Sequence, residues 1–403
     1  MISNLVTKRG AVRTKARQTS ILNSPHEAVA GAGVVDDQTD SRICVGGKMN
    51  RSIRRGLQIT AALAAAVLVC LSIVVPYLAY PGTPSKSNFM TFEGYVELPK
   101  HGLLNVLDYM ALSGKTLFVT SESTGSLFKI DLNPDRLSVS PVAEMPGAGA
   151  AHGMALFPDA NVAFLTRSEE NIVQVFDPKT LEQFQSIPVA DDADAILYVP
   201  SARLVYVANG GPKMATLIDP ERRVTVGTIS LPGEPEFVAQ DPQTGLLYQN
   251  LQDLNSLAGI DLGSRSIVGR WPLDPCERPT GMAIDPSTRR LFAVCAGNAL
   301  LVVFDLDQHR VITSLKIGGG PDSVAFDPIL HRVYSAGKDG KLTVIHQDGP
   351  DAYRVLDEIR THYGAHTLAV DPISHKVYVG YASLLVRPRI AVFSPTRGED
   401  KPQ

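Results

Sequence analysis

The sequence has few cysteines and no strong charge of either sign. Only four of the 403 residues are cysteine, and none lies in a Cys-x-x-Cys-His motif, which excludes a covalently bound c-type haem. The net charge is −3 at pH 7, and basic residues do not gather in the repeats that make up most of the chain. Because nucleic acids are bound by a basic face, we expect no nucleic acid among the partners.

The glycine-rich segments are short, and neither of the two clearest fits a nucleotide site. Gly147-Ala148-Gly149 is too short for a dinucleotide-binding loop and opens no predicted helix. Gly318-Gly319-Gly320-Pro321 lacks the lysine of a phosphate-binding loop. We therefore expect no nucleotide cofactor.

A proline follows one short apolar run after another, and these marker prolines recur with a nearly constant period. They are Pro158, Pro200, Pro242, Pro286, Pro328 and Pro372, spaced by 42 or 44 residues. One step earlier, Gly114 follows the equivalent run Met110-Ala111-Leu112, which gives seven copies of one unit. A period of about 40 to 45 residues is typical of four-stranded propeller blades. The sequence thus predicts an all-β fold, a seven-bladed β-propeller of antiparallel blades over residues 89–397, followed by a polar tail, residues 398–403.

The last copy has only three strands, because Phe393-Ser394-Pro395 is followed by polar residues. The missing strand is expected at the front of the domain, where Gly94 to Pro99 resembles the fourth strand Gly227 to Pro232 of an inner copy. Pairing the first strand with the last three closes the ring and hides two open edges. We therefore expect the seam in the blade of residues 365–396.

Two segments carry a resemblance to a known repeat. Tyr206-Val207-Ala208-Asn209 and Tyr378-Val379-Gly380, each about six residues after a marker proline, resemble the YVTN-type repeat, and residues 89–396 look like a YncE-like seven-bladed propeller. The resemblance implies an exported protein. It implies no particular ligand, since proteins of this type differ in what they bind.

An uncharged apolar segment precedes the repeats. Residues 57–80 contain no charged side chain, and about 20 such residues suffice to cross a bilayer as a helix. Arg51, Arg54 and Arg55 stand before it, whereas residues 81–88 carry only Lys86. The positive-inside rule then predicts a basic cytoplasmic tail (1–55), an inner-membrane helix or uncleaved signal anchor (56–80), a linker (81–88) and an extracytoplasmic propeller, periplasmic or extracellular.

Two other interpretations of this N-terminal region stay open. Met49 to Arg55 looks like the charged start of a cleaved signal peptide, although the apolar run is long for one and Tyr77-Leu78-Ala79 lacks the small residues of a cleavage site. In the same view residues 1–48 are an extension upstream of the true start. Otherwise they form a disordered cytoplasmic tail.

One polar residue stands six positions before the marker of each copy. The seven are Asp108, His152, Asp194, Glu236, Thr280, Asp322 and His366. They should lie at the start of the innermost strands, around one mouth of the central channel. Carboxylates and imidazoles are ligands for divalent cations, so this ring is the candidate ligand-binding and metal site, with His152 and His366 as candidate proton carriers. The alternative is a polar rim that only faces water.

Two functions follow from these expectations. The first is a membrane-anchored binding or scaffolding module for an extracytoplasmic protein, glycan or small ligand. The second is a metal-assisted hydrolase or lyase with its site in the channel mouth.

Two of the cysteines lie in one copy. Cys276 precedes its first strand and Cys295 ends its second, and antiparallel strands bring these ends to the same rim. In an oxidising compartment a disulfide between them is plausible, and the alternative is two free thiols.

Overall fold

The computed structural model describes residues 83–132, 141–158, 161–384 and 387–396, with Thr60, Leu63, Ala64 and Leu68. The predicted tails, residues 1–55 and 398–403, lie outside the described residues, as does residue 397 at the end of the predicted propeller. So does the predicted span 56–80, except at those four positions. No helix in the described part of the chain combines the length and the apolar character needed to cross a bilayer.

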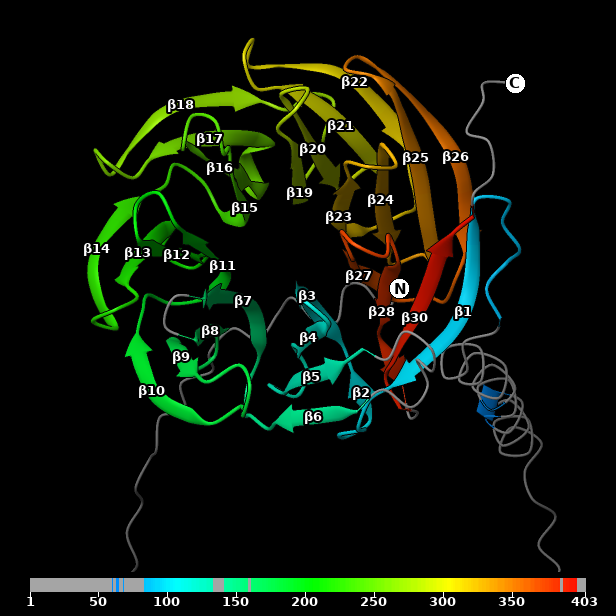
Figure 1. Ribbon diagram of the computed structural model, residues 1–403, viewed down its shortest axis with the longest axis horizontal. Helices are drawn as coiled ribbons and strands as arrows, with labels where there is room; N and C mark the ends of the chain where they lie inside the picture. Colours follow the sequence, from blue (N-terminus) through cyan, green and yellow to red (C-terminus); the bar gives the residue numbers. More distant parts are fainter. Residues whose placement is uncertain are drawn as a thin grey trace, which may run out of the picture. The chain divides into compact units, whose positions relative to one another are not determined.

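Seven four-stranded antiparallel sheets are arranged around one axis, each with its first strand innermost (Figure 1). The first three blades are β3 (Leu107–Ser113), β4 (Thr116–Ser121), β5 (Leu127–Asp131) and β6 (Val142–Met145); β7 (Ala151–Phe157), β8 (Val162–Arg167), β9 (Ile172–Phe176) and β10 (Gln183–Pro188); and β11 (Ala193–Val199), β12 (Leu204–Asn209), β13 (Met214–Asp219) and β14 (Val224–Ser230). The predicted seven-bladed propeller is confirmed.

The next three blades repeat the same meander. They are β15 (Pro235–Gln240), β16 (Leu247–Leu251), β17 (Ser256–Asp261) and β18 (Ser266–Pro272), with a short 3-10 helix η3 (Gln252–Leu254); β19 (Pro279–Asp285), β20 (Arg290–Cys295), β21 (Leu300–Asp305) and β22 (Arg310–Lys316); and β23 (Pro321–Asp327), β24 (Arg332–Gly337), β25 (Lys341–Gly349) and β26 (Ala352–Arg360).

The seventh blade is closed by the first strand of the domain. Its order is β27 (Ala365–Val370), β28 (Val377–Tyr381), β30 (Arg389–Pro395) and β1 (Met90–Glu97). β1 runs antiparallel to β30, from Met90 opposite Pro395 to Glu97 opposite Arg389. The seam is therefore where the sequence predicts it. A two-stranded sheet of β2 (Leu104–Asn105) and β29 (Ser383–Leu384) adds a second link between the first and last blades.

Part of the predicted linker is bound to the propeller. The backbone N–H of Ser85 donates to the carbonyl of Arg360 at 2.8 Å, and the N–H of Arg360 donates to Oγ of Ser85 at 2.8 Å. Arg360 ends β26, the outer strand of the sixth blade. The chain is thus already held against a blade edge before β1 begins.

The marker prolines stand where the inner strands end. Each follows its strand directly or after one aspartate, and the residue three positions later has a positive φ: Asn161, Arg203, Gly245, Arg289, His331 and His375. Such a left-handed residue closes a short hairpin whose twist fits the flanking strands. The regular spacing therefore marks the return from the first to the second strand.

The second strand of each blade contributes one aromatic side chain that packs between this blade and a neighbouring one. These rings are Phe118, Phe164, Tyr206, Tyr248, Phe292, Tyr334 and Tyr378, all at most 2 % exposed. Each belongs to a different one of the seven apolar clusters that join adjacent blades. The core of the propeller is thus a ring of seven similar contacts.

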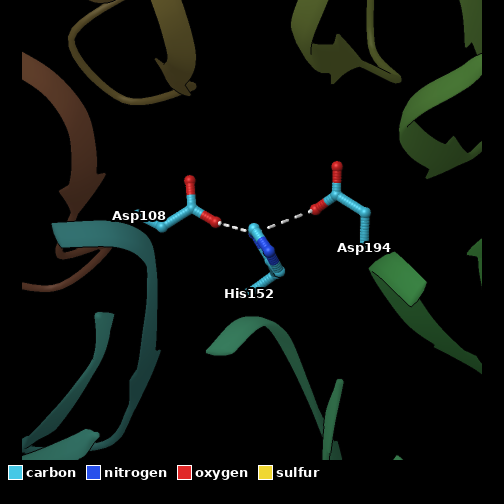
Figure 2. A group of neighbouring side chains, drawn as sticks. All are labelled: Asp108, His152 and Asp194. Carbon is cyan, nitrogen blue, oxygen red and sulfur yellow. Dashed lines mark hydrogen bonds and ion pairs between the residues drawn. The ribbon is translucent and has the colours of Figure 1, made fainter. Parts of the chain in front are cut away.

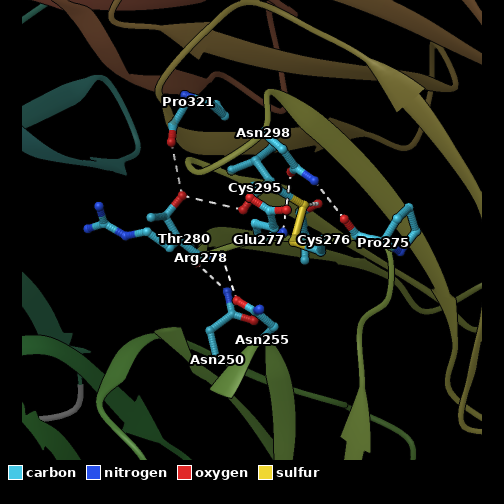
Figure 3. Close-up of a disulfide and its surroundings, with 12 residues drawn as sticks. Asn250, Asn255, Pro275, Cys276, Glu277, Arg278, Thr280, Cys295, Asn298 and Pro321 are labelled. Atoms are coloured by element: carbon cyan, nitrogen blue, oxygen red, sulfur yellow. Dashed lines mark hydrogen bonds between the residues drawn. A yellow bond between two sulfur atoms is a disulfide. The ribbon is translucent and has the colours of Figure 1, made fainter. Parts of the chain in front are cut away.

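The structure contains a disulfide between Cys276 and Cys295, with an S–S distance of 2.05 Å (Figure 3). Cys276 precedes β19, and Cys295 is the last residue of β20. Both cysteines are buried, at 1 % and 0 % exposed. The bridge fixes the loop that leads into the fifth blade.

We expect replacement of an interblade aromatic ring to destabilise the propeller strongly. Phe292→Ala leaves a cavity between the fifth and sixth blades, which should lower the free energy of unfolding by about 3 to 5 kcal/mol. Phe184, 45 % exposed on an outer strand, is the matched control, and Phe184→Ala should cost less than about 1 kcal/mol. Chemical denaturation of both variants measures this. Equal midpoints would contradict the packing role of the ring.

Thiol titration tests the disulfide. Denatured without reductant, the chain should expose only the thiols of Cys44 and Cys70, and reduction should raise the number to all four. The paired variant Cys276→Ser, Cys295→Ser should lose about 3 kcal/mol of stability, since the bridge closes a loop with a sequence separation of 19. Four reactive thiols before reduction would show that the bridge is absent.

Candidate functional site

A β-bulge stands near the start of every inner strand, and the ring residues lie in it. The pairing with the second strand shifts between Leu107 and Met110, Ala151 and Met154, Ala193 and Ile196, Pro235 and Val238, Pro279 and Met282, Pro321 and Ser323, and Ala365 and Thr367. In each blade the ring residue, six positions before the marker, lies between the two residues where the pairing shifts. A bulge bends the strand and redirects its side chains, so the backbone itself sets these residues apart from the ladder.

Three of the predicted ring residues meet in one cluster, Asp108 from β3, His152 from β7 and Asp194 from β11 (Figure 2). Nδ1 of His152 lies 2.6 Å from Oδ2 of Asp108 and 3.7 Å from Oδ1 of Asp194. One ligand atom from each residue lies within 4.8 Å of the other two. The imidazole nitrogen thus points between two carboxylates, as Figure 2 shows.

The second ring nitrogen of His152 also has a polar partner. Nε2 of His152 lies 3.0 Å from Oγ of Ser168, which follows the second strand of the same blade. With a carboxylate on one ring nitrogen and a hydroxyl on the other, the orientation of the ring is fixed.

The electrostatics of the cluster favour a positive charge between the two aspartates, which the protonated imidazole of His152 itself can carry. Burial alone lowers the pKa of His152, but the hydrogen bond to Asp108 and the negative charges of Asp108 and Asp194 raise it to about 10. Burial raises the pKa of Asp194 to about 7, against the attraction of His152. Oδ1 of Asp194 is buried and accepts no hydrogen bond from the described residues. A buried carboxylate oxygen without a partner is costly, and a bound cation removes that cost.

Two further ring residues, Glu236 and Asp322, interact electrostatically with this cluster. Burial, together with the charges of Asp194, Asp322 and Asp108, raises the pKa of Glu236 well above its ordinary value, which favours its neutral form. Oδ2 of Asp322 lies 3.4 Å from Nζ of Lys338, and this carboxylate is the main cause of the raised pKa of Lys338.

Lys338 and Ser168 belong to a second set of residues that the sequence analysis missed. In every blade the residue after the second strand donates its backbone N–H to the carbonyl of the residue two before the ring position. The seven donors are Glu122, Ser168, Gly210, Gln252, Ala296, Lys338 and Ala382. Six of them stand ten residues after a marker proline, so the same count would have found them. They border the ring residues on the same face of the propeller.

Thr280 is placed differently from the three residues of the cluster. Thr280 is buried, and its hydroxyl donates to the carbonyl of Pro321 at 3.0 Å (Figure 3). The structure therefore does not bring Thr280 into the cluster, because its hydroxyl joins two neighbouring inner strands instead. His366 lies in β27, and its side chain is outside the described part of the structure.

Two aromatic rings meet from opposite blades beside the ring residues. Tyr109 from β3 and Phe237 from β15 stack with their centroids 5.7 Å apart and their planes at 8°. Both rings directly follow a ring residue of their blade. In the other five blades the residue at that place is small: Gly153, Ala195, Gly281, Ser323 and Thr367. Burial and the charges of Asp194, Asp108, Glu236 and Asp322 raise the pKa of Tyr109 well above its ordinary value. The pair therefore spans the centre of the propeller next to the carboxylates.

Comparison with known proteins adds evidence for the fold. No family model matches this chain, and no curated protein matches it. Among solved structures, a chain of "Kuenenia stuttgartiensis Hydrazine Synthase" is similar, with a TM-score of 0.59 and 18 % identity over 70 % of this chain and 94 % of that chain. At this identity the likeness supports the propeller fold alone. The resemblance to the YVTN-type repeat stays an expectation from the sequence.

Proposed function

We propose that the protein is a membrane-anchored, extracytoplasmic binding module that holds a divalent metal ion at the channel mouth through Asp108, His152 and Asp194. One observation carries the proposal. The imidazole nitrogen of His152 points between two carboxylates from the blades on either side, and one of the oxygens facing it is buried without a hydrogen-bond partner among the described residues.

The donor set suits a borderline cation such as Zn²⁺. Imidazole nitrogen and carboxylate oxygen are its usual ligands beside thiolate, and Ser168 on Nε2 supplies the outer contact that orients a metal-binding histidine. Three protein ligands leave a coordination position free for water or a further ligand. The side chains of the three residues are 13 to 24 % exposed, so a small ligand can reach them.

Export and anchoring rest on two features of the chain. The uncharged residues 57–80 with arginines on one flank support a single-pass anchor that leaves the propeller outside the cytoplasm. The disulfide between Cys276 and Cys295 supports an oxidising compartment.

Binding is favoured over the enzymatic alternative for a chemical reason. A metal-assisted hydrolase or lyase needs a proton carrier in addition to the metal ligands. As a metal ligand through Nδ1, His152 cannot also exchange protons there, and the side chain of the other candidate, His366, lies outside the described part of the structure. We therefore propose a binding role for the mouth.

Zn²⁺ binding to the full chain tests the metal site by calorimetry. We expect one ion per chain, and Asp108→Asn or Asp194→Asn should weaken binding by more than about 100-fold because each removes a ligand. Asp322→Asn is the matched control, since it neutralises a ring carboxylate outside the cluster of three. It should change the affinity by less than about tenfold. An equal loss in all three variants, or no binding by the unchanged chain, would overturn the proposal.

The affinity should also depend on pH with a definite sign. Zn²⁺ displaces the proton of His152, whose pKa is raised to about 10, so the affinity should rise about tenfold per pH unit between about pH 7 and 9. Below about pH 7 Asp194, with its pKa raised to about 7, must also lose a proton, and the slope should steepen. Calorimetry at about pH 6, 7 and 8 measures both slopes. A flat profile would contradict a ligand role for His152.

Cell fractionation tests the anchor. The full chain should stay in the membrane fraction after washing with alkaline carbonate, because residues 57–80 would lie in the bilayer. A chain that starts at residue 83 should be recovered in the soluble fraction with the same circular dichroism spectrum. Release of the full chain by carbonate would contradict a membrane-spanning segment.

A further inference from the structure

A polar pocket lies between the fourth and fifth blades, apart from the cluster of Asp108, His152 and Asp194. Its volume is about 500 Å³, and it is lined by Glu234, Gln252, Asp253, Asn255, Glu277 and Arg278. Glu234 comes two residues before the ring position Glu236, and Arg278 two before Thr280. Small-molecule sites occupy about 300 to 1,000 Å³, so the pocket is large enough for one.

All six lining side chains end in a planar polar group: a carboxylate or amide with two polar atoms, or the guanidinium of Arg278 with three. Such groups can form paired hydrogen bonds with two neighbouring hydroxyls of a ligand. Each hydroxyl can donate to a carboxylate or accept from a guanidinium, because it is both a donor and an acceptor. In the part of the chain that the structure describes, no aliphatic or aromatic side chain lines the pocket. This lining is unsuited to an apolar ligand and suits a polyhydroxylated one.

Much of the hydrogen-bonding capacity of the pocket is unused. The carboxylates of Glu234 and Glu277 form no hydrogen bond or ion pair with the described residues, and both residues are exposed. Arg278 donates from Nη2 to Oε1 of Gln252 at 3.0 Å, which leaves its other guanidinium N–H groups for a ligand. Acceptors and donors therefore stand side by side, as a sugar requires.

The walls are held in place by the backbone. The N–H of Gln252 donates to Glu234, and those of Ala296 and Gly297 donate to Arg278 and Glu277. The N–H of Arg278 donates to Oδ1 of Asn255 at 2.8 Å, and the disulfide fixes Cys276 directly before Glu277 (Figure 3). A preformed wall loses little entropy on binding.

The charges in and beside the pocket sum to −1, from three carboxylates against Arg278 and Lys213. Asp253 is neutralised by Lys213, whose Nζ lies 2.5 Å from Oδ2. Arg278 opposes the two remaining carboxylates, those of Glu234 and Glu277. This balance favours a neutral ligand over a strongly charged one.

We infer that this pocket binds a neutral carbohydrate of one or two sugar rings. The inference does not depend on the metal site, because none of the six lining residues belongs to the cluster of three. Since no aromatic ring lines the pocket to add stacking energy, we expect dissociation constants of about 1 to 10 mM.

Saturation-transfer NMR tests the inference on the full chain in a detergent without a sugar headgroup, with maltose, cellobiose and diacetylchitobiose as probes. At least one sugar should give saturable signals, with EDTA present as well as absent. Glu277→Ala should weaken its binding about tenfold. Asp191→Ala is the matched control, because Asp191 is an exposed residue two positions before β11, as Glu277 is before β19. It should leave the affinity unchanged.

Glu277→Gln separates a sugar from a cationic ligand. It keeps a planar group with an acceptor oxygen and should cost a sugar only about two- to threefold, whereas a cation such as spermidine would lose as much as in Glu277→Ala. No saturable signal from any of the three sugars at about 20 mM would overturn the inference. So would spermidine binding that depends on Glu277 in the absence of sugar binding.

Discussion

One aromatic ring wedged between each pair of neighbouring blades is the contact on which the architecture depends. Every one of the seven apolar clusters contains one of these rings, from the second strand of a blade. A blade buries its face only against the next blade, so the ring of contacts has to close. The pairing of β1 with β30 completes the last blade and leaves no unpaired neighbour in the circle.

Closure of the circle also creates the site. Seven inner strands start on one face, and a bulge at the same position in each turns one residue out of the hydrogen-bonded ladder. Polar residues more than 40 positions apart in the chain are thereby brought within 4.8 Å, as in Asp108, His152 and Asp194. The opposite blades contribute Tyr109 and Phe237, whose stacked rings lie beside this cluster.

The same face presents two different environments. The cluster of Asp108, His152 and Asp194 comes from the first three blades and concentrates negative charge around one imidazole. The pocket between the fourth and fifth blades has charges that sum to −1, Lys213 included, and is lined by paired donors and acceptors. A repeated scaffold thus presents unlike surroundings on one face, because the residues at the ring and after the second strand vary from blade to blade while the apolar contacts do not.

The sequence by itself determined the number of blades, the hairpins after the marker prolines and the blade that closes the circle, because these follow from local periodicity and turn chemistry. It also placed Cys276 and Cys295 at one rim. It did not separate Thr280, whose hydroxyl is used between strands, from Asp108, His152 and Asp194, which meet. Ser168 and Lys338 were missed although they stand ten residues after a marker proline, whereas the stack of Tyr109 on Phe237 has no such signal. Only the tertiary structure decided which ring residues meet and that Tyr109 stacks on Phe237, because these contacts depend on distances across the axis, which leave no periodic signal along the chain.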